Sequence, residues 1–100
     1  MAIDWQLLQD LKRAVKTKAQ SSEGEITDLA EACRMDLQIR GGVYVSEDFS
    51  DPLEKQALKL YCKANYGYDA DSEKFRAAYE ALRDSMALSG EYGRKDKKNV

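Results

Sequence analysis

The sequence predicts an all-α fold, a compact bundle of about four helices with short connections. Apolar residues recur at helical spacing in four segments of the chain. The single proline, Pro52, falls where a helix would begin, and the six glycines lie near the expected helix ends. A length of 100 residues with a hydrophobic content of 43% indicates one domain with one core.

The first two segments each have one apolar stripe. We expect the first helix from about Asp4 to Lys18, with Asp4 as its N-cap. The second opens at Ser22, and Glu25 three residues later completes the pattern of a capping box. The glycines at 41–42 should end this helix. The two stripes are Trp5, Leu8, Leu11 and Val15 in the first helix, and Ile26, Leu29, Ala30, Cys33 and Leu37 in the second.

The third segment has two apolar stripes. It begins at Asp51 and Pro52, a capping side chain followed by proline at the first helical position, and should run to about Tyr66. A helix that is apolar on two sides is either central in its fold or has a partner outside the monomer. Because a small chain has difficulty burying both sides, we predict that one stripe forms a subunit or packing interface. That stripe is Leu58, Cys62 and Tyr66, and the opposite one is Leu53, Ala57, Leu60, Tyr61 and Ala64.

The fourth segment should be capped by Asp71 or Ser72 and end near Ser89 and Gly90. Its main apolar face has helical spacing, which favours a core position. Three alanines leave a smooth surface beside that face. The core face is Phe75, Tyr79, Leu82 and Met86, and the alanines are Ala77, Ala78 and Ala81.

Residues 43–45, Val-Tyr-Val, form the only β-branched and aromatic run, which is too short for an independent sheet. We favour a loop in which Phe49 or Tyr44 plugs the core. The alternative is an extended element that pairs with a neighbouring chain.

The composition argues against catalysis. The absence of histidine removes the commonest general base and the commonest metal ligand. Cys33 and Cys62 are far apart in sequence and are expected to be buried, reduced thiols. The carboxylates of Glu47, Asp48 and Asp51 favour an acidic rim or a helix cap over a cation site. We therefore predict no enzyme, no cofactor and no metal site.

The net charge of −2 combines two unlike parts. Residues 93–100 contain four of the 16 cations and one of the 18 anions, so the remainder has 12 and 17 and a net charge of −5. An acidic body lacks the basic footprint of a duplex-DNA binder. We predict a disordered tail, which serves as a solubilising terminus, a nucleic-acid arm or a docking segment. No signal peptide or membrane span is expected. The tail cations are Arg94, Lys95, Lys97 and Lys98.

Three blocks of the sequence resemble one known family. They are Glu31 to Val43 (EACRMDLQIRGGV), Leu53 to Tyr66, and Tyr68 to Tyr92, which contains AYEAL and LSGEY. In order and spacing they resemble the small head-tail connector family of long-tailed bacteriophages and prophages, also described as head-completion or DNA-packaging adaptor proteins. The resemblance covers about residues 24–92.

The resemblance implies a single helical connector domain over residues 1–92, followed by the basic tail 93–100. It implies a ring of identical subunits, commonly dodecameric, beneath the portal protein of the virion, assembled in the host cytoplasm. The ring would extend the DNA channel, let DNA pass without sequence-specific binding, and dock a stopper or tail-completion protein. The first segment, Trp5 to Lys18, is longer than the family pattern.

The sequence is also compatible with two other functions. One is a small helical nucleic-acid-binding or regulatory protein, although the acidic helix starts at Asp51 and Asp71 would repel phosphate. The other is a helical interaction module of a cellular pathway.

Overall fold

Helices make up most of the described chain in the computed structural model, which describes residues 3–17, 20–43, 45, 49–66 and 71–89. The predicted all-α fold is confirmed for these residues. In chain order the elements are α1 (Trp5–Ala14), the 3₁₀ turn η1 (Gln20–Ser22), α2 (Glu23–Met35), the π-helical turn η2 (Asp36–Arg40), α3 (Pro52–Asn65) and α4 (Ser72–Leu88).

Two of the predicted N-caps are confirmed. Asp4 Oδ1 accepts a hydrogen bond of 2.7 Å from the amide of Leu7 at the start of α1. Asp51 Oδ2 accepts from the amides of Leu53 at 2.9 Å and Glu54 at 3.4 Å at the start of α3. Both aspartates have extended backbone torsions, the conformation that lets a cap side chain reach back over the first turn.

The predicted capping box at Ser22 is wrong. Its side chain makes no cap hydrogen bond to α2, because η1 runs directly into the helix and gives Ser22 helical torsions, φ −82° and ψ −7°. Asp71 precedes α4 with φ −95° and ψ 13° and likewise makes no cap hydrogen bond. An effective N-cap needs an extended backbone, which neither residue has.

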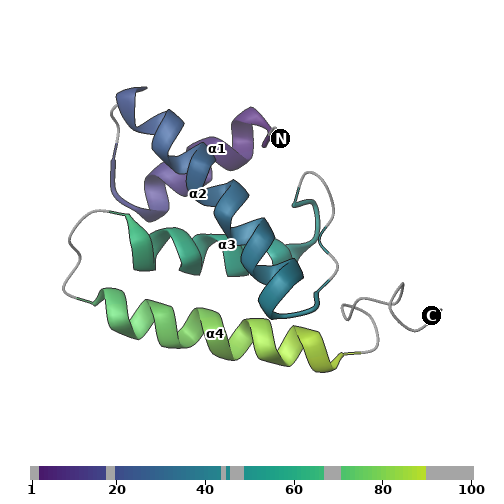
Figure 1. The fold of residues 1–100 in the computed structure, drawn as a ribbon. Helices are drawn as coiled ribbons and strands as arrows, with labels where there is room; N and C mark the ends of the chain where they lie inside the picture. The colour runs from purple at the N-terminus through teal and green to yellow at the C-terminus, as the bar shows by residue number, and fades with distance from the viewer. Residues whose placement is uncertain (1–2, 18–19, 44, 46–48, 67–70, 90–100) are drawn as a thin grey trace.

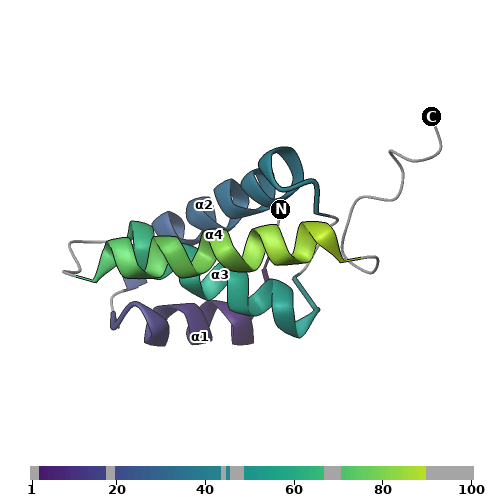
Figure 2. The same cartoon turned by 90° about the horizontal axis from the view of Figure 1, so that it is seen from below.

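α3 occupies the centre of the fold and contacts α1, α2 and α4. Figure 1 shows α4 running alongside α3 while α2 crosses it. Figure 2, seen from below, shows α1 and α2 on opposite sides of α3. Among the described residues, no helix has the length and apolar character that a bilayer crossing requires.

Leu58 and Cys62 were predicted to form a subunit or packing interface, and the central position of α3 makes it a packing interface within the chain, which corrects the subunit alternative. Both side chains are 0% exposed in the single chain, because helices of the same chain cover both sides of α3. Tyr66 is half-buried and packs against the same core. The buried apolar residues that make up this core are Leu7, Leu11, Ile26, Ala30, Cys33, Leu37, Val43, Val45, Phe49, Ala57, Leu58, Cys62, Tyr79 and Met86.

The apolar stripe predicted for α1 is corrected at its first residue. Trp5 is 71% exposed, whereas Leu11 is fully buried and Leu8 and Val15 are half-buried against the core. Trp5 is the first residue of α1, and Leu7 in the same first turn is the residue that is buried there. On α4, Tyr79 and Met86 are buried as predicted.

The predicted plug is confirmed at Phe49, which is fully buried. Its φ of 54° lies in the left-handed region, which is costly for a residue with a bulky side chain. The guanidinium of Arg34 lies over the Phe49 ring, 4.7 Å from its centroid. Burial and this cation–π contact offset the backbone strain. Tyr44 lies outside the described residues.

Candidate functional site

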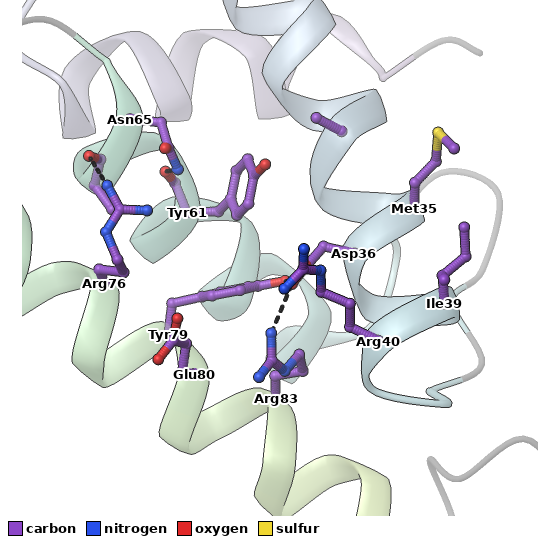
Figure 3. Close-up of a pocket in the computed structure, with 12 residues that line it drawn as sticks. Met35, Asp36, Ile39, Arg40, Tyr61, Asn65, Arg76, Tyr79, Glu80 and Arg83 are labelled. Carbon is purple, nitrogen blue, oxygen red and sulfur yellow. Dashed lines mark hydrogen bonds and ion pairs between the residues drawn. The ribbon is translucent and has the colours of Figure 1, made fainter.

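A groove of about 440 Å³ opens between α2 with η2 on one side and α3 with α4 on the other (Figure 3). Polar and apolar side chains both line it, as is usual for ligand and partner sites. The lining residues are Ala32, Met35, Asp36, Ile39, Arg40, Tyr61, Ala64, Asn65, Arg76, Tyr79, Glu80 and Arg83.

Asp36 is the most heavily bonded side chain in the groove. Its Oδ2 accepts hydrogen bonds from the Tyr79 hydroxyl at 2.6 Å and from Arg83 Nη1 at 3.0 Å. Its Oδ1 lies 3.3 Å from Arg40 Nε. Figure 3 shows the Tyr79 and Arg83 side chains reaching from α4 toward this carboxylate. Because the Asp36 and Arg83 side chains are only 17% and 16% exposed, the pair holds η2 firmly against α4.

Gly41 and Gly42, which follow η2, allow the close contact between η2 and α4. A Cβ on Gly41 would stand 2.7 Å from Arg83 Cγ and 2.9 Å from the Leu37 carbonyl oxygen, so a side chain there would push Arg83 away. Gly42 has a φ of 66°, which suits glycine. The two glycines therefore end the helix and also let α4 approach the turn.

Two tyrosines provide aromatic surface within the groove. The rings of Tyr61 and Tyr79 meet edge to face, with centroids 5.1 Å apart and planes at 69°. Burial, neighbouring Cys33 and the hydrogen bond to Asp36 raise the pKa of Tyr79 far above its ordinary value. Burial is also the main cause that raises the pKa of Tyr61. Both hydroxyls therefore stay protonated at neutral pH.

The thiols near this site are also unreactive. Burial, with a contribution from nearby Cys62, raises the pKa of Cys33 well above that of an ordinary thiol. Burial raises the pKa of Cys62 to about 12. Both thiols are fully buried and free, as the sequence predicted, and a protonated buried thiol is a poor nucleophile. Since Asp36 is engaged by three donors, the chemistry of the groove favours binding over reaction.

One edge of the groove is an exposed apolar ridge, which we define as Ala32, Met35 and Ile39. Met35 is 53% exposed and Ile39 is 70% exposed, which is high for side chains of this size. Sequence reasoning missed this ridge, although its signal is present. The spacing of 32, 35 and 39 is helical and falls between the residues of the buried stripe that includes Cys33 and Leu37.

The other residues predicted to be functional lie elsewhere. Leu58 and Cys62 belong to the core, and Tyr66 does not line the groove. Within the described residues, no group of three or more carboxylate or thiol side chains is placed to hold a metal ion. Asp51 acts as a helix cap, whereas Glu47 and Asp48 lie outside the described residues. So do the tail cations Arg94, Lys95, Lys97 and Lys98.

Comparison of this chain with family models, curated proteins and solved structures found no match in any of the three. The resemblance to head-tail connectors therefore remains a prediction.

Proposed function

We propose that this chain is a non-enzymatic structural subunit of a bacteriophage or prophage head-tail connector. In this role a ring of subunits lies beneath the portal protein, extends the DNA channel and presents a docking surface for a stopper or tail protein. The proposal rests on the three sequence blocks between residues 24 and 92 that resemble the connector family. The all-α bundle with short connections is the kind of fold that the resemblance implies.

The groove is the structural observation that best supports a docking role. Its ion cluster around Asp36 is already assembled in the single chain, and its apolar ridge is exposed. A rigid polar cluster beside uncovered apolar surface binds a partner at a low cost in conformational order. The engaged carboxylate and the buried thiols also leave the groove without an activated base or nucleophile.

The acidic body suits a channel through which DNA must slide. Residues 1–92 have a net charge of −5, and carboxylates repel phosphates. A regulator that reads DNA would instead need basic side chains where a helix enters the groove of the duplex. In this chain, by contrast, α3 and α4 begin beside the acidic residues Asp51 and Asp71.

Electron microscopy of this chain mixed with its cognate portal protein is the direct test. We expect a ring of extra density on one face of the portal and weak, salt-sensitive DNA binding without sequence preference. Portal rings that stay bare, together with a discrete high-affinity DNA site, would instead support the regulatory alternative.

Deletion of residues 93–100 tests the tail. If the tail docks on assembly, the truncated chain should keep its helical circular dichroism and lose portal binding. Normal particle assembly by the truncated chain would rule out a docking role for the tail cations.

A further inference from the structure

We propose that the groove binds an amphipathic helix of a partner protein whose apolar face packs on the ridge and whose flank is acidic. The inference names the chemistry of the docking surface that the proposed function requires. It rests on the proposed function in one respect only, which is the identity of the protein in the assembly that supplies the helix.

The shape and apolarity of the groove fit a helix. Ala32, Met35 and Ile39 stand at successive turns along one edge, and the Tyr61 and Tyr79 rings provide aromatic surface deeper in the groove. A volume of about 440 Å³ accommodates a few anchoring side chains, and not a whole helix. Helices bind such grooves by inserting anchors spaced three or four residues apart while their backbone stays outside.

The charges of the groove select an acidic flank. Three arginines line it, Arg40, Arg76 and Arg83, against the carboxylates of Asp36 and Glu80. Arg83 and Asp36 largely neutralise each other at 3.0 Å, so an approaching partner meets mainly Arg40, Arg76 and Glu80. The lining residues thus have a net charge of +1 on a chain whose overall charge is −2, and the carboxylates of Glu73 and Asp84, which pair with Arg76 and Arg83, lie outside the lining.

Arg40 and Arg76 are available to change partners. The Arg40 side chain is 75% exposed, and its ion pair with Asp36 has a length of 3.3 Å. The Arg76 side chain is 42% exposed, and its contacts to other described residues are long, 3.5 Å to the Ala64 carbonyl oxygen and 3.7 Å to Glu73. A guanidinium has five N–H donors in a fixed fork that matches a carboxylate, so each arginine can accept an incoming Glu or Asp.

Other occupants fit less well. The chain's own tail, residues 93–100, is basic and would meet like charge at the arginines. A DNA backbone would gain from the arginines but would lie against Glu80 and an apolar ridge, which offer phosphate nothing. The third candidate is a second copy of this chain, which is acidic overall. The experiment distinguishes its binding from the binding of a partner helix.

The experiment titrates the full chain into two fluorescein-labelled helical peptides of about four turns and follows fluorescence anisotropy. Both peptides carry leucine at positions i, i+3 and i+7. One has glutamate along the flank, and the matched peptide has lysine at the same places. We expect the acidic peptide to bind about tenfold more tightly than the basic one, with the difference shrinking at high salt.

Four variants locate the binding site. Ile39→Ser in the ridge and Arg76→Glu in the groove should each weaken binding of the acidic peptide about tenfold. Leu88→Ser and Lys74→Glu are the matched controls, since Leu88 is 89% exposed on α4 and Lys74 is an exposed cation, and neither lines the groove. The controls should bind like the parent chain. Circular dichroism verifies that all four variants fold.

Three results would overturn the proposal: equal binding of both peptides, no binding of either, or equal weakening by the control variants. Displacement of the peptide by a short DNA duplex would assign the arginines to phosphate and also overturn it. So would a dimer, seen by sedimentation, that Ile39→Ser dissociates. The titration contains no portal protein, so the two proposals fail separately. If the chain binds the peptide but no portal, only the proposed function is overturned. If the chain binds the portal but not the peptide, only this inference is overturned.

Discussion

The two ends of α2 are held in the fold by different means. At its N-terminal end, Ile26 is buried in the core, and an ion pair of 2.9 Å joins Glu23 Oε2 to Lys12 Nζ of α1. At its C-terminal end, the helix continues as the π-helical turn η2, where Asp36 accepts hydrogen bonds from Tyr79 and Arg83. The first end depends mainly on apolar burial, whereas the second depends on a specific polar cluster.

This difference explains which end is suited to binding. Burial is non-directional and tolerates small shifts, but the hydrogen bonds that Asp36 accepts from Tyr79 and Arg83 fix the positions of these two donors. The side chains around Asp36 are therefore preorganised, and they are the ones that line the groove. If the two ends differ in this way, substitutions at Ile26, Asp36 and Glu23 should change stability by different amounts.

The largest effect should come from the apolar end. Ile26→Ala removes a fully buried side chain and should lower the free energy of unfolding by about 3 kcal/mol, through lost burial and the cavity left behind. Urea denaturation followed by far-ultraviolet circular dichroism measures it. The control Ile39→Ala changes a 70% exposed residue of the same type and should cost less than about 0.5 kcal/mol. Similar costs at the two positions would contradict the assigned burial.

At the polar end, Asp36→Ala should cost about 2 kcal/mol, because it leaves the Tyr79 hydroxyl and the Arg83 guanidinium without their shared acceptor. Asp84→Ala is the matched control. Asp84 also bonds Arg83, at 3.1 Å, but its side chain is 67% exposed, so its loss should cost less than about 0.5 kcal/mol. The same denaturation assay compares the two, and a control as costly as Asp36→Ala would show that burial does not strengthen the cluster.

The protein should lose stability in alkali. Cys33, Cys62 and Tyr79 have raised pKa values in the folded chain, so the unfolded chain releases these protons first. For Cys62 the contribution is complete below its ordinary pKa of 9.0 and is lost as pH rises from there toward about 12.

Cys62→Ala isolates that contribution. Over this pH range it should reduce the dependence of unfolding free energy on pH by up to about 1.4 kcal/mol per pH unit. Denaturant titrations at a series of pH values, with reductant present, measure the slope. An unchanged slope would mean that the thiol of the parent chain ionises equally in both states.

The smallest effect should be at the ion pair between α1 and α2. Glu23→Gln should cost about 1 kcal/mol or less, because the amide oxygen of glutamine can still accept a hydrogen bond from Lys12 Nζ, whose side chain is only 9% exposed, while Glu23 is 32% exposed. High salt should reduce the difference between variant and parent. A cost above that of Asp36→Ala would reverse the comparison between the two ends of α2.

Local patterns were enough to predict much of the fold. Helical spacing located all four α-helices of the described chain, and the caps at Asp4 and Asp51 follow from residue type and position. The error at Ser22 arose because a 3₁₀ turn continues into α2 and removes the extended backbone that a cap requires.

The groove could not be predicted in the same way. Asp36 meets Tyr79 and Arg83 across 43 and 47 residues of sequence, and no local pattern specifies such a pairing. The two stripes of α3 were recognised, but periodicity alone does not tell a central helix from one with an external partner. Periodicity therefore leaves a subunit interface open for Leu58 and Cys62, whereas neighbouring helices of the same chain cover them.

The exposed indole of Trp5 determines how this protein is best observed. As the only tryptophan, it would be the natural fluorescent reporter, but in the folded chain it is already largely surrounded by water. Its emission should therefore change little on unfolding. The asymmetric packing of Tyr61 against Tyr79 should instead produce a near-ultraviolet circular dichroism signal. The useful optical signal thus comes from the groove, where it reports on folding and on the arrival of a partner.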